Sequence, residues 1–139
     1  MEIEHYLMFN RNCAEALKVY AAAFDGTIAE IQKFGGVSGG PGFSVADEDK
    51  DLVLHSRLII AGQTLMCSDS TRELTPGSNM YVSVGSDDEA LIRRAWAALV
   101  DGGEVYMDLT PTFFAKAHGS LRDRFGVNWM MTANAVLAA

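Results

Sequence analysis

Three histidines are the side chains of this sequence best suited to move a proton near neutral pH: His5, His55 and His118. His55 and Arg57 stand between the leucines of a predicted strand over residues 52–61. Because strand side chains alternate between faces, both should point away from the leucines. An imidazole there could serve as a general base toward a small ligand. Structural roles stay open beside this one: a hydrogen-bonded strand histidine, and an arginine paired with a surface carboxylate.

The elements that position these residues repeat along the chain. Two polar segments stand 74 positions apart (86 − 12): Asn12-Cys13-Ala14-Glu15 and Ser86-Asp87-Asp88-Glu89. Each predicts a capping box, in which Asn12 or Ser86 bonds a free backbone N–H and the glutamate reaches back to the cap. Asp25-Gly26 and Asp101-Gly102 predict the ends of the two helices, with glycine in the left-handed turn. The chain is therefore predicted to be a duplicated unit.

Each half is predicted to contain a strand, a helix and three further strands. In the first half these are Ile3–Phe9, Cys13–Phe24, Thr27–Phe34, Leu52–Ala61 and Gln63–Asp69, with a tight turn at Ala61-Gly62-Gln63. In the second half they are Ser78–Gly85, Asp87–Val100, Glu104–Leu109, Phe113–Arg122 and Val127–Ala133. Apolar residues at helical spacing predict the helix faces that pack on a sheet: Cys13, Ala16, Leu17, Tyr20 and Phe24, then Ile92, Ala95, Trp96 and Leu99.

Length and composition predict one compact domain over residues 1–139, since 139 residues of 49% hydrophobic content can bury a single core. Within it we expect a first module at 1–70, a linker at 71–77 and a second module at 78–134. The glycine-rich segment Gly35–Gly42 predicts either a plain surface loop or a lid over a ligand.

Several classes of partner and location are disfavoured. The net charge of −7 opposes binding to nucleic acid and to anionic membranes. No apolar run approaches the roughly 20 residues that span a bilayer, and Met1–Glu4 lacks the features of a signal peptide. The two cysteines, Cys13 and Cys67, are expected to be free thiols. These observations predict a cytoplasmic protein.

The sequence resembles the vicinal oxygen chelate superfamily, which includes glyoxalase I, bleomycin-resistance proteins and extradiol dioxygenases, and within it the PhnB-like branch. The matching runs are Tyr6–Asn10, Glu15–Leu17, His55–Leu58, Leu65–Asp69, Thr112–Phe114 and Asp123–Trp129. The resemblance implies an α+β fold in which two βαβββ modules form a curved, mostly antiparallel sheet around a concave pocket, with the helices outside. It also implies a homodimer, because members of the superfamily commonly pair.

The superfamily's metal ligands come from the first and last strand of each module. Carried over singly, these positions are His5, Met66, Asn79 and Met130. A single imidazole without a carboxylate suits a divalent ion poorly, and thioethers are soft ligands. We therefore expect no metal and no other cofactor, although His55 or His118 could in principle rebuild a non-standard site.

A metal-free pocket lined by the same strand faces is the alternative that the residues favour. Taking His5 as inward, strand alternation predicts a lining of mixed polar and apolar character. We assign catalytic roles to His5 and His55, and ligand binding to Phe9, Arg57, Met66, Ser68, Asn79, Tyr81, Asn128 and Met130.

The expected function is binding of a small organic molecule in this pocket, and the sequence leaves open whether the molecule is also transformed. The alternatives are a metal-dependent lyase, isomerase or dioxygenase of glyoxalase type, and a drug-binding protein like the bleomycin-resistance members. Methyltransferase activity is not supported, because no glycine-rich loop follows a strand and opens a helix.

Overall fold

The computed structural model describes residues 1–37 and 43–136, and the chain forms two compact units, Met1–Thr75 and Pro76–Ala139. The expectation for Gly35–Gly42 falls largely outside the described residues; Phe34–Gly36 form a short 3₁₀ helix. No helix in the described ranges is long and apolar enough to cross a membrane.

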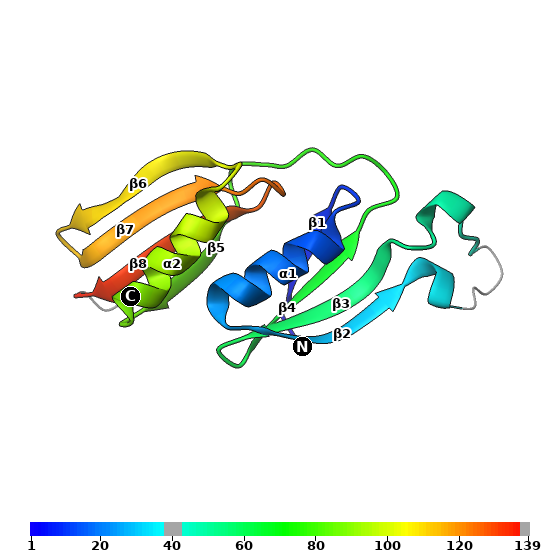
Figure 1. Ribbon diagram of the computed structural model, residues 1–139, viewed down its shortest axis with the longest axis horizontal. Coiled ribbons are helices and arrows are strands. Elements are labelled where there is room, and N and C mark those ends of the chain that lie inside the picture. Colours follow the sequence, from blue (N-terminus) through cyan, green and yellow to red (C-terminus); the bar gives the residue numbers. More distant parts are fainter. Residues whose placement is uncertain (38–42, 137–139) are drawn as a thin grey trace. The chain divides into compact units, whose positions relative to one another are not determined.

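The first unit is one four-stranded sheet with one α-helix. Its elements are β1 (His5–Phe9), α1 (Cys13–Phe24), β2 (Thr27–Lys33), β3 (Val53–Ile60) and β4 (Gln63–Asp69). The strands lie in the order β1-β4-β3-β2, where β1 and β4 are parallel and the other neighbours antiparallel. Helix α1 lies across one face of this sheet (Figure 1).

The second unit repeats this arrangement. Its elements are β5 (Val82–Ser86), α2 (Glu89–Val100), β6 (Glu104–Thr112), β7 (Ala115–Arg122) and β8 (Asn128–Ala135). The strand order is β5-β8-β7-β6, again with one parallel and two antiparallel pairs, and α2 covers one face (Figure 1). The predicted α+β fold with two βαβββ modules is thus confirmed.

The predicted helix faces form the two cores. Every residue predicted for the α1 face is at most 4% exposed, and so are Ile92, Ala95 and Leu99 of α2. Trp96 departs from the prediction because it remains partly exposed. The turn between β3 and β4 is confirmed as well: Ala61 and Gly62 both have positive φ (49° and 76°), as a tight two-residue hairpin turn requires.

Both predicted capping boxes are wrong. Asn12 precedes α1 but makes no side-chain cap bond, and its buried Oδ1 has no partner. The Asp69 carboxylate from β4 instead accepts the Cys13 N–H (2.9 Å). In α2 the cap is Asp88, whose Oδ1 accepts the Leu91 N–H (3.1 Å), so the helix begins two residues later than predicted. The Ser86 hydroxyl, at the end of β5, accepts the backbone N–H of Asp88 (3.0 Å).

Both helices end at the predicted residues, Phe24 and Val100, but the predicted left-handed glycine follows only the second helix. Gly102 has φ of 72°, as expected. After α1, however, Asp25 takes the left-handed conformation (φ 52°), and Gly26 is needed for another reason. A Cβ on Gly26 would lie 3.0 Å from the Ile59 carbonyl oxygen, so glycine permits close approach of the neighbouring strand.

The strand register shows how the modules correspond. Met66 pairs with Tyr6, and its counterpart Met130 pairs with Ser83, so β1 and β5 correspond at a spacing of 77 (83 − 6). The 74-residue spacing of the polar segments therefore does not apply to the strands. By this register the counterpart of His5 is Val82 rather than Asn79, which precedes β5.

Candidate functional site

Each sheet has one face against its own helix and a second face that this helix does not cover, here called the open face. On the first sheet, the helix face carries buried Phe9, Ser56, Leu58 and Cys67. Strand alternation places the intervening residues on the open face. Two of them, Tyr6 and Met8, are 44% and 46% exposed.

The centre of the first open face is a contact between Tyr6 and His55. The Tyr6 hydroxyl lies 2.9 Å from Nδ1 of His55, and the ring centroids are 5.8 Å apart. If the phenol donates this hydrogen bond, the imidazole proton is on Nε2, and that nitrogen is the one left for a ligand. The pair joins β1 to β3 across the width of β4.

The same face also carries Arg57 of β3 and Met66 and Ser68 of β4. For Arg57 this is the side opposite the leucines, as predicted, whereas Met66 and Ser68 were predicted to share a side with His5 and instead share it with Tyr6 and Met8. Arg57 pairs in register with Met66 of β4 and with Glu30 of β2. Ser68 is 5% exposed and donates its hydroxyl to the Met8 sulfur (3.1 Å). The face therefore combines a phenol, an imidazole, a guanidinium and two thioethers.

The open face of the second sheet has a histidine at the corresponding position. Arg57 and Ser120 pair with the corresponding methionines, Met66 and Met130, so β3 and β7 correspond at a spacing of 63 (120 − 57), and His118 corresponds to His55. Nδ1 of His118 lies 2.9 Å from the Thr132 hydroxyl.

The Phe114 ring meets that of His118 edge-on, with centroids 4.9 Å apart. The predicted site residues did not include Tyr6 or His118. The separation of His55 and His118, 63 residues, differs from the 74-residue spacing of the polar segments, so the correspondence of the two histidines shows only in the strand pairing.

Asn128 lies near the end of the same face but is committed to the protein itself. It is 5% exposed, its Oδ1 accepts the Tyr106 hydroxyl (2.9 Å), and its Nδ2 donates to the carbonyls of Gly77 and Met80. Tyr81 packs edge-on against Tyr106, with centroids 6.2 Å apart. This group pins the chain that leads into β5.

His5 and Phe9 lie on the helix side of β1, contrary to the inward direction assumed for this strand. Phe9 is fully buried and its ring lies 6.2 Å from that of Tyr20 in α1. His5 pairs in register with the buried Leu65, so it shares that side, although it is exposed at the strand's first position. The open face of β1 is formed instead by Tyr6 and Met8.

The four positions carried over as metal ligands are therefore not equivalent. Met66 and Met130 lie on open faces, His5 lies on a helix side, and Asn79 is exposed ahead of β5. Across residues 1–37 and 43–136, the structure brings together no group of three or more His, Cys, Asp or Glu side chains that could hold a metal ion.

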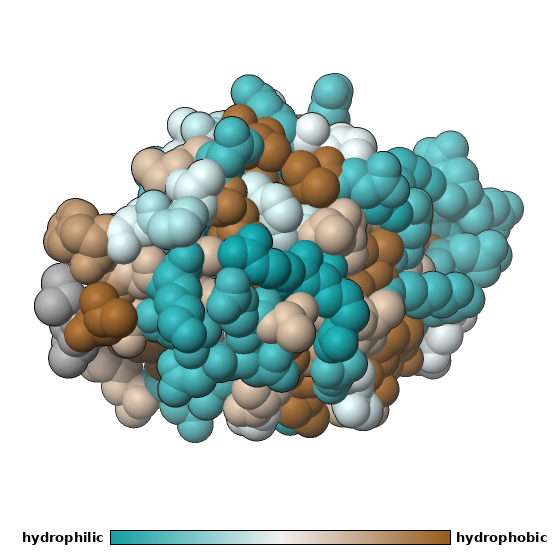
Figure 2. Space-filling view, turned by 60° about the vertical axis from the view of Figure 1, so that its left-hand side comes forward, coloured by the Kyte–Doolittle hydropathy of each residue, from teal (hydrophilic) through white to brown (hydrophobic). Residues whose placement is uncertain are grey.

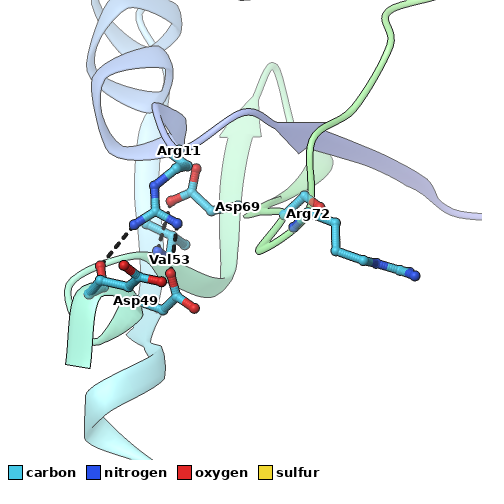
Figure 3. A network of polar contacts seen from close by, with 7 residues as sticks. Arg11, Asp49, Val53, Asp69 and Arg72 are labelled. Carbon is cyan, nitrogen blue, oxygen red and sulfur yellow. Dashed lines mark hydrogen bonds and ion pairs between the residues drawn. The ribbon is translucent and has the colours of Figure 1, made fainter. Parts of the chain in front are cut away.

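A hollow of about 290 Å³ lies in the first unit where β1 and β4 end. Its lining is Asn10, Arg11, Ser70, Thr71, Arg72 and Glu73. Arg11 donates to Asp49 Oδ1 (2.6 Å) and to the Glu48 carbonyl (2.8 Å), while Arg72 points away from this pair (Figure 3). The hydrogen bond to Asp49 raises the pKa of Arg11. Arg11 thus holds the segment before β3 rather than a ligand.

The two cysteines are free and buried, Cys13 as the first residue of α1 and Cys67 in β4. Burial raises the pKa of each thiol to about 12. Repulsion between the two thiolates, and between the Cys13 thiolate and Asp69, adds to the effect on Cys13. A thiol held protonated is a poor nucleophile, so neither cysteine is a candidate for covalent catalysis.

Comparison with known proteins agrees with this architecture. Residues 1–132 match the family described as 3-demethylubiquinone-9 3-methyltransferase, and the chain belongs to this family. The protein PA1353 from Pseudomonas aeruginosa is 36% identical, with 96% of this chain and 98% of that chain covered and a TM-score of 0.82. A PhnB protein from Bacillus cereus is 30% identical, with 96% and 99% covered and a TM-score of 0.71. The resemblance to the PhnB-like branch is confirmed.

The same fold occurs in a fosfomycin resistance protein, FosX from Mesorhizobium loti. It is 9% identical over 98% of this chain and 93% of that chain, with a TM-score of 0.61. At that identity the likeness concerns the fold alone.

Proposed function

We propose that this chain is a member of the vicinal oxygen chelate superfamily that binds a small organic molecule on the open faces of its sheets without a metal ion. One observation carries the proposal: His55 and His118 occupy the same position in the two modules, each beside a hydroxyl partner on its open face. Histidines kept only for packing would have no reason to stand on the faces that the helices leave uncovered.

The chemistry we propose for the first open face is proton transfer between His55 and a bound ligand. The Tyr6 hydroxyl fixes the orientation of the imidazole through Nδ1. When Nδ1 carries the proton and donates to the Tyr6 oxygen, Nε2 would accept a proton from the ligand, and the resulting imidazolium would return it from Nε2. Arg57 and Met66 flank this nitrogen on the same face and would orient the ligand. His5 no longer belongs to the proposal, because it lies on the helix side of β1.

The histidines themselves provide the test, since the sequence holds only three. Protein labelled with ¹³C at histidine Cε1 should give three resonances, assigned with His5→Gln, His55→Gln and His118→Gln. A library of small organic molecules should contain binders that shift the resonance of His55 or His118 and leave that of His5 unchanged. If binders shift His5 alone, or if none of the three responds to any compound, the open faces are not ligand sites.

We do not assign methyl transfer, despite the family's description. The connection from β1 to α1 is Asn10-Arg11-Asn12, and that from β5 to α2 includes Asp87 and Asp88. Neither offers glycines that would let the backbone approach a nucleoside-containing cofactor.

We expect the purified protein to contain no stoichiometric metal. The open faces offer imidazole, phenol and thioether groups. Gln32 stands opposite His55 and Thr110 opposite His118, while the Glu30 carboxylate stands opposite Arg57, so neither histidine has a hard anionic ligand opposite it. Elemental analysis should therefore find well below one Zn, Mn, Ni or Fe per chain. About one ion per chain, lost in His55→Gln or His118→Gln, would restore the glyoxalase-type alternative.

We further propose that the protein acts in the cytoplasm as a homodimer. Hydrophobic residues reach the surface in several places (Figure 2), and in the second unit Met80 and Phe113 are 76% and 86% exposed. Burying such side chains between two copies would remove them from water. Light scattering at micromolar concentration should give the mass of two 15.1 kDa chains. A single-chain mass would exclude the dimer.

A further inference from the structure

We infer that the open face of the first sheet selects a small aromatic carboxylate, with Arg57 binding the carboxylate group and Tyr6, Met8 and Met66 contacting the ring. The inference rests on the proposed small-molecule function and deepens it by naming the ligand class. The observation behind it is that the Arg57 guanidinium lies on the same sheet face as the apolar Met66 and the hydrogen-bonded Tyr6–His55 pair.

The strand register fixes the arrangement. Tyr6, Met66, Arg57 and Glu30 are successive in-register neighbours, so they form one row across all four strands. His55 lies two residues from Arg57 on the same side of β3, within hydrogen-bond distance of the Tyr6 hydroxyl. A ligand lying along this row would meet the phenol, a thioether and the guanidinium in sequence.

Arg57 is available to such a ligand. Within the described part of the chain its guanidinium makes no hydrogen bond and no ion pair, although Glu30 is its neighbour in register. Arg11 and Arg93, by contrast, are paired with Asp49 and Glu89. A planar guanidinium binds a carboxylate through two parallel hydrogen bonds, which fits a planar ligand anion.

The side chains beside Arg57 on this face favour a ligand with an aromatic ring. Tyr6 and Met8 are both nearly half exposed, and Met66 is partly exposed between Tyr6 and Arg57. Thioether sulfur makes favourable contacts with aromatic rings, and tyrosine stacks on them.

The second open face does not offer the same combination. Ser120 stands at the position of Arg57, and Met107 at that of Glu30. The guanidinium on β7, that of Arg122, donates to the Gly77 carbonyl (3.0 Å). Lys116 is exposed two residues from His118, but an ammonium does not make the two parallel hydrogen bonds of a guanidinium. Carboxylate recognition is therefore assigned to the first unit alone.

Three probes of matched shape test the inference: benzoate, benzamide and benzamidinium, which are planar and carry negative, zero and positive charge. Each is titrated into the full-length protein while the His55 Cε1 resonance reports binding. Benzoate should bind best. Arg57→Gln should weaken benzoate about tenfold, as loss of a charge-assisted hydrogen bond predicts, and leave benzamide unchanged. Glu30→Gln should strengthen benzoate binding, because it removes a negative charge that stands opposite Arg57 and repels the ligand carboxylate.

The control is Arg72→Gln, which removes the same charge from the same unit at the hollow described above and should leave benzoate binding unaltered. If Arg57→Gln and Arg72→Gln weaken benzoate binding equally, the effect comes from the net charge of the protein, and the inference is overturned. So would tighter binding of benzamidinium than of benzoate, which would favour the drug-binding alternative. If other compounds shift His55 and benzoate does not, the ligand class is wrong while the proposed function stands. The proposed function fails only if no compound shifts His55 or His118.

Discussion

The two modules share a scaffold and differ in what they attach to it. Both place a histidine on the open face of the third strand, but His55 is bonded by a phenol from β1 and His118 by the Thr132 hydroxyl from β8. Beside them the first module has an unpaired arginine where the second has Ser120. The two modules therefore share backbone positions more closely than side-chain chemistry. A function of one open face cannot be transferred to the other from the repeat alone.

A buried aspartate stabilises each unit: Asp69 in the first and Asp123 in the second. The Asp69 carboxylate accepts the Cys13 and Val53 N–H groups (both 2.9 Å) and so ties the start of α1 to β3. The Asp123 carboxylate accepts the backbone N–H groups of Phe125 and Val127 and the Trp129 indole N–H (2.8 Å), which closes the β7–β8 turn. Both are 4% exposed.

The largest effect is expected from Asp123→Asn and Asp69→Asn. Each change turns an amide toward backbone N–H donors and leaves buried donors unpaired, so we expect a loss of about 3 kcal/mol of unfolding free energy for each. Both tryptophans, Trp96 and Trp129, lie in the second unit. In urea unfolding, tryptophan fluorescence therefore reports the second unit and circular dichroism reports both units. Equal shifts of the two signals in Asp69→Asn would mean that the units unfold together. A loss of unfolding free energy below about 1 kcal/mol would mean that water molecules accept the hydrogen bonds that the carboxylate accepted.

Exchanging equivalent residues of the two middle strands should have the next largest effect. Ser56 and Gly119 correspond at the 63-residue spacing, but a Cβ on Gly119 would lie 2.9 Å from the backbone of Leu109. We expect Gly119→Ser to cost about 2 kcal/mol through this overlap. Ser56→Gly should cost less, since it loses mainly one hydrogen bond to the Cys67 carbonyl. Thermal unfolding of both variants tests which substitution lowers stability more. If Gly119→Ser costs less than Ser56→Gly, the backbone of β6 moves to make room for the added side chain.

The buried thiols predict a pH effect that belongs to the first unit. Their pKa is about 12 in the folded chain, against 9.0 for a free thiol, so between these values the folded state binds more protons than the unfolded state. Stability should therefore be fully present below pH 9 and fall above it, by up to about 1.4 kcal/mol per pH unit for each thiol. Urea unfolding at pH 8 and pH 10 measures the slope. Cys13→Ala and Cys67→Ala should each reduce it, whatever their effect at pH 8, and an unchanged slope in both would assign it to other groups.

The smallest effect distinguishes the two helix starts. Asp88→Ala removes a side-chain cap and should cost about 1 kcal/mol. Asn12→Ala should cost under about 0.5 kcal/mol, because Asn12 makes no cap bond and its Oδ1 is buried without a partner. Thermal melts of the two single variants suffice. If Asn12→Ala proves the more harmful, its amide makes a contact in solution that the structure does not show.

Sequence patterns predicted best where a residue's neighbours decide its place. Helix α1 and strand β4 have the predicted bounds, and His55 and Arg57 lie opposite the buried Leu58 as alternation requires. In β1 alternation gave no direction, because Tyr6 and Met8 on one side are as apolar as Leu7 and Phe9 on the other. Only pairing with β4 resolves this, and pairing is not local.

The helix caps were mistaken for a related reason. Ser86, Asp87 and Asp88 are all good caps, and the backbone, rather than the side chains, selects Asp88. The cap of α1 comes from Asp69, which is 56 residues away from Cys13 in the sequence. No local pattern could show a partner at that distance. The Tyr6–His55 contact of the site was hidden in the same way.

The closure of each sheet within one continuous stretch of chain has a consequence for synthesis on the ribosome. The first sheet needs β4, because β1 has no other strand partner, and β4 ends at Asp69. Asp69 also supplies the carboxylate at the start of α1, so helix, sheet and cap become complete with the same residue. The first unit can thus finish folding while the second is still being translated, which shortens the time for which its apolar strands are exposed to other nascent chains.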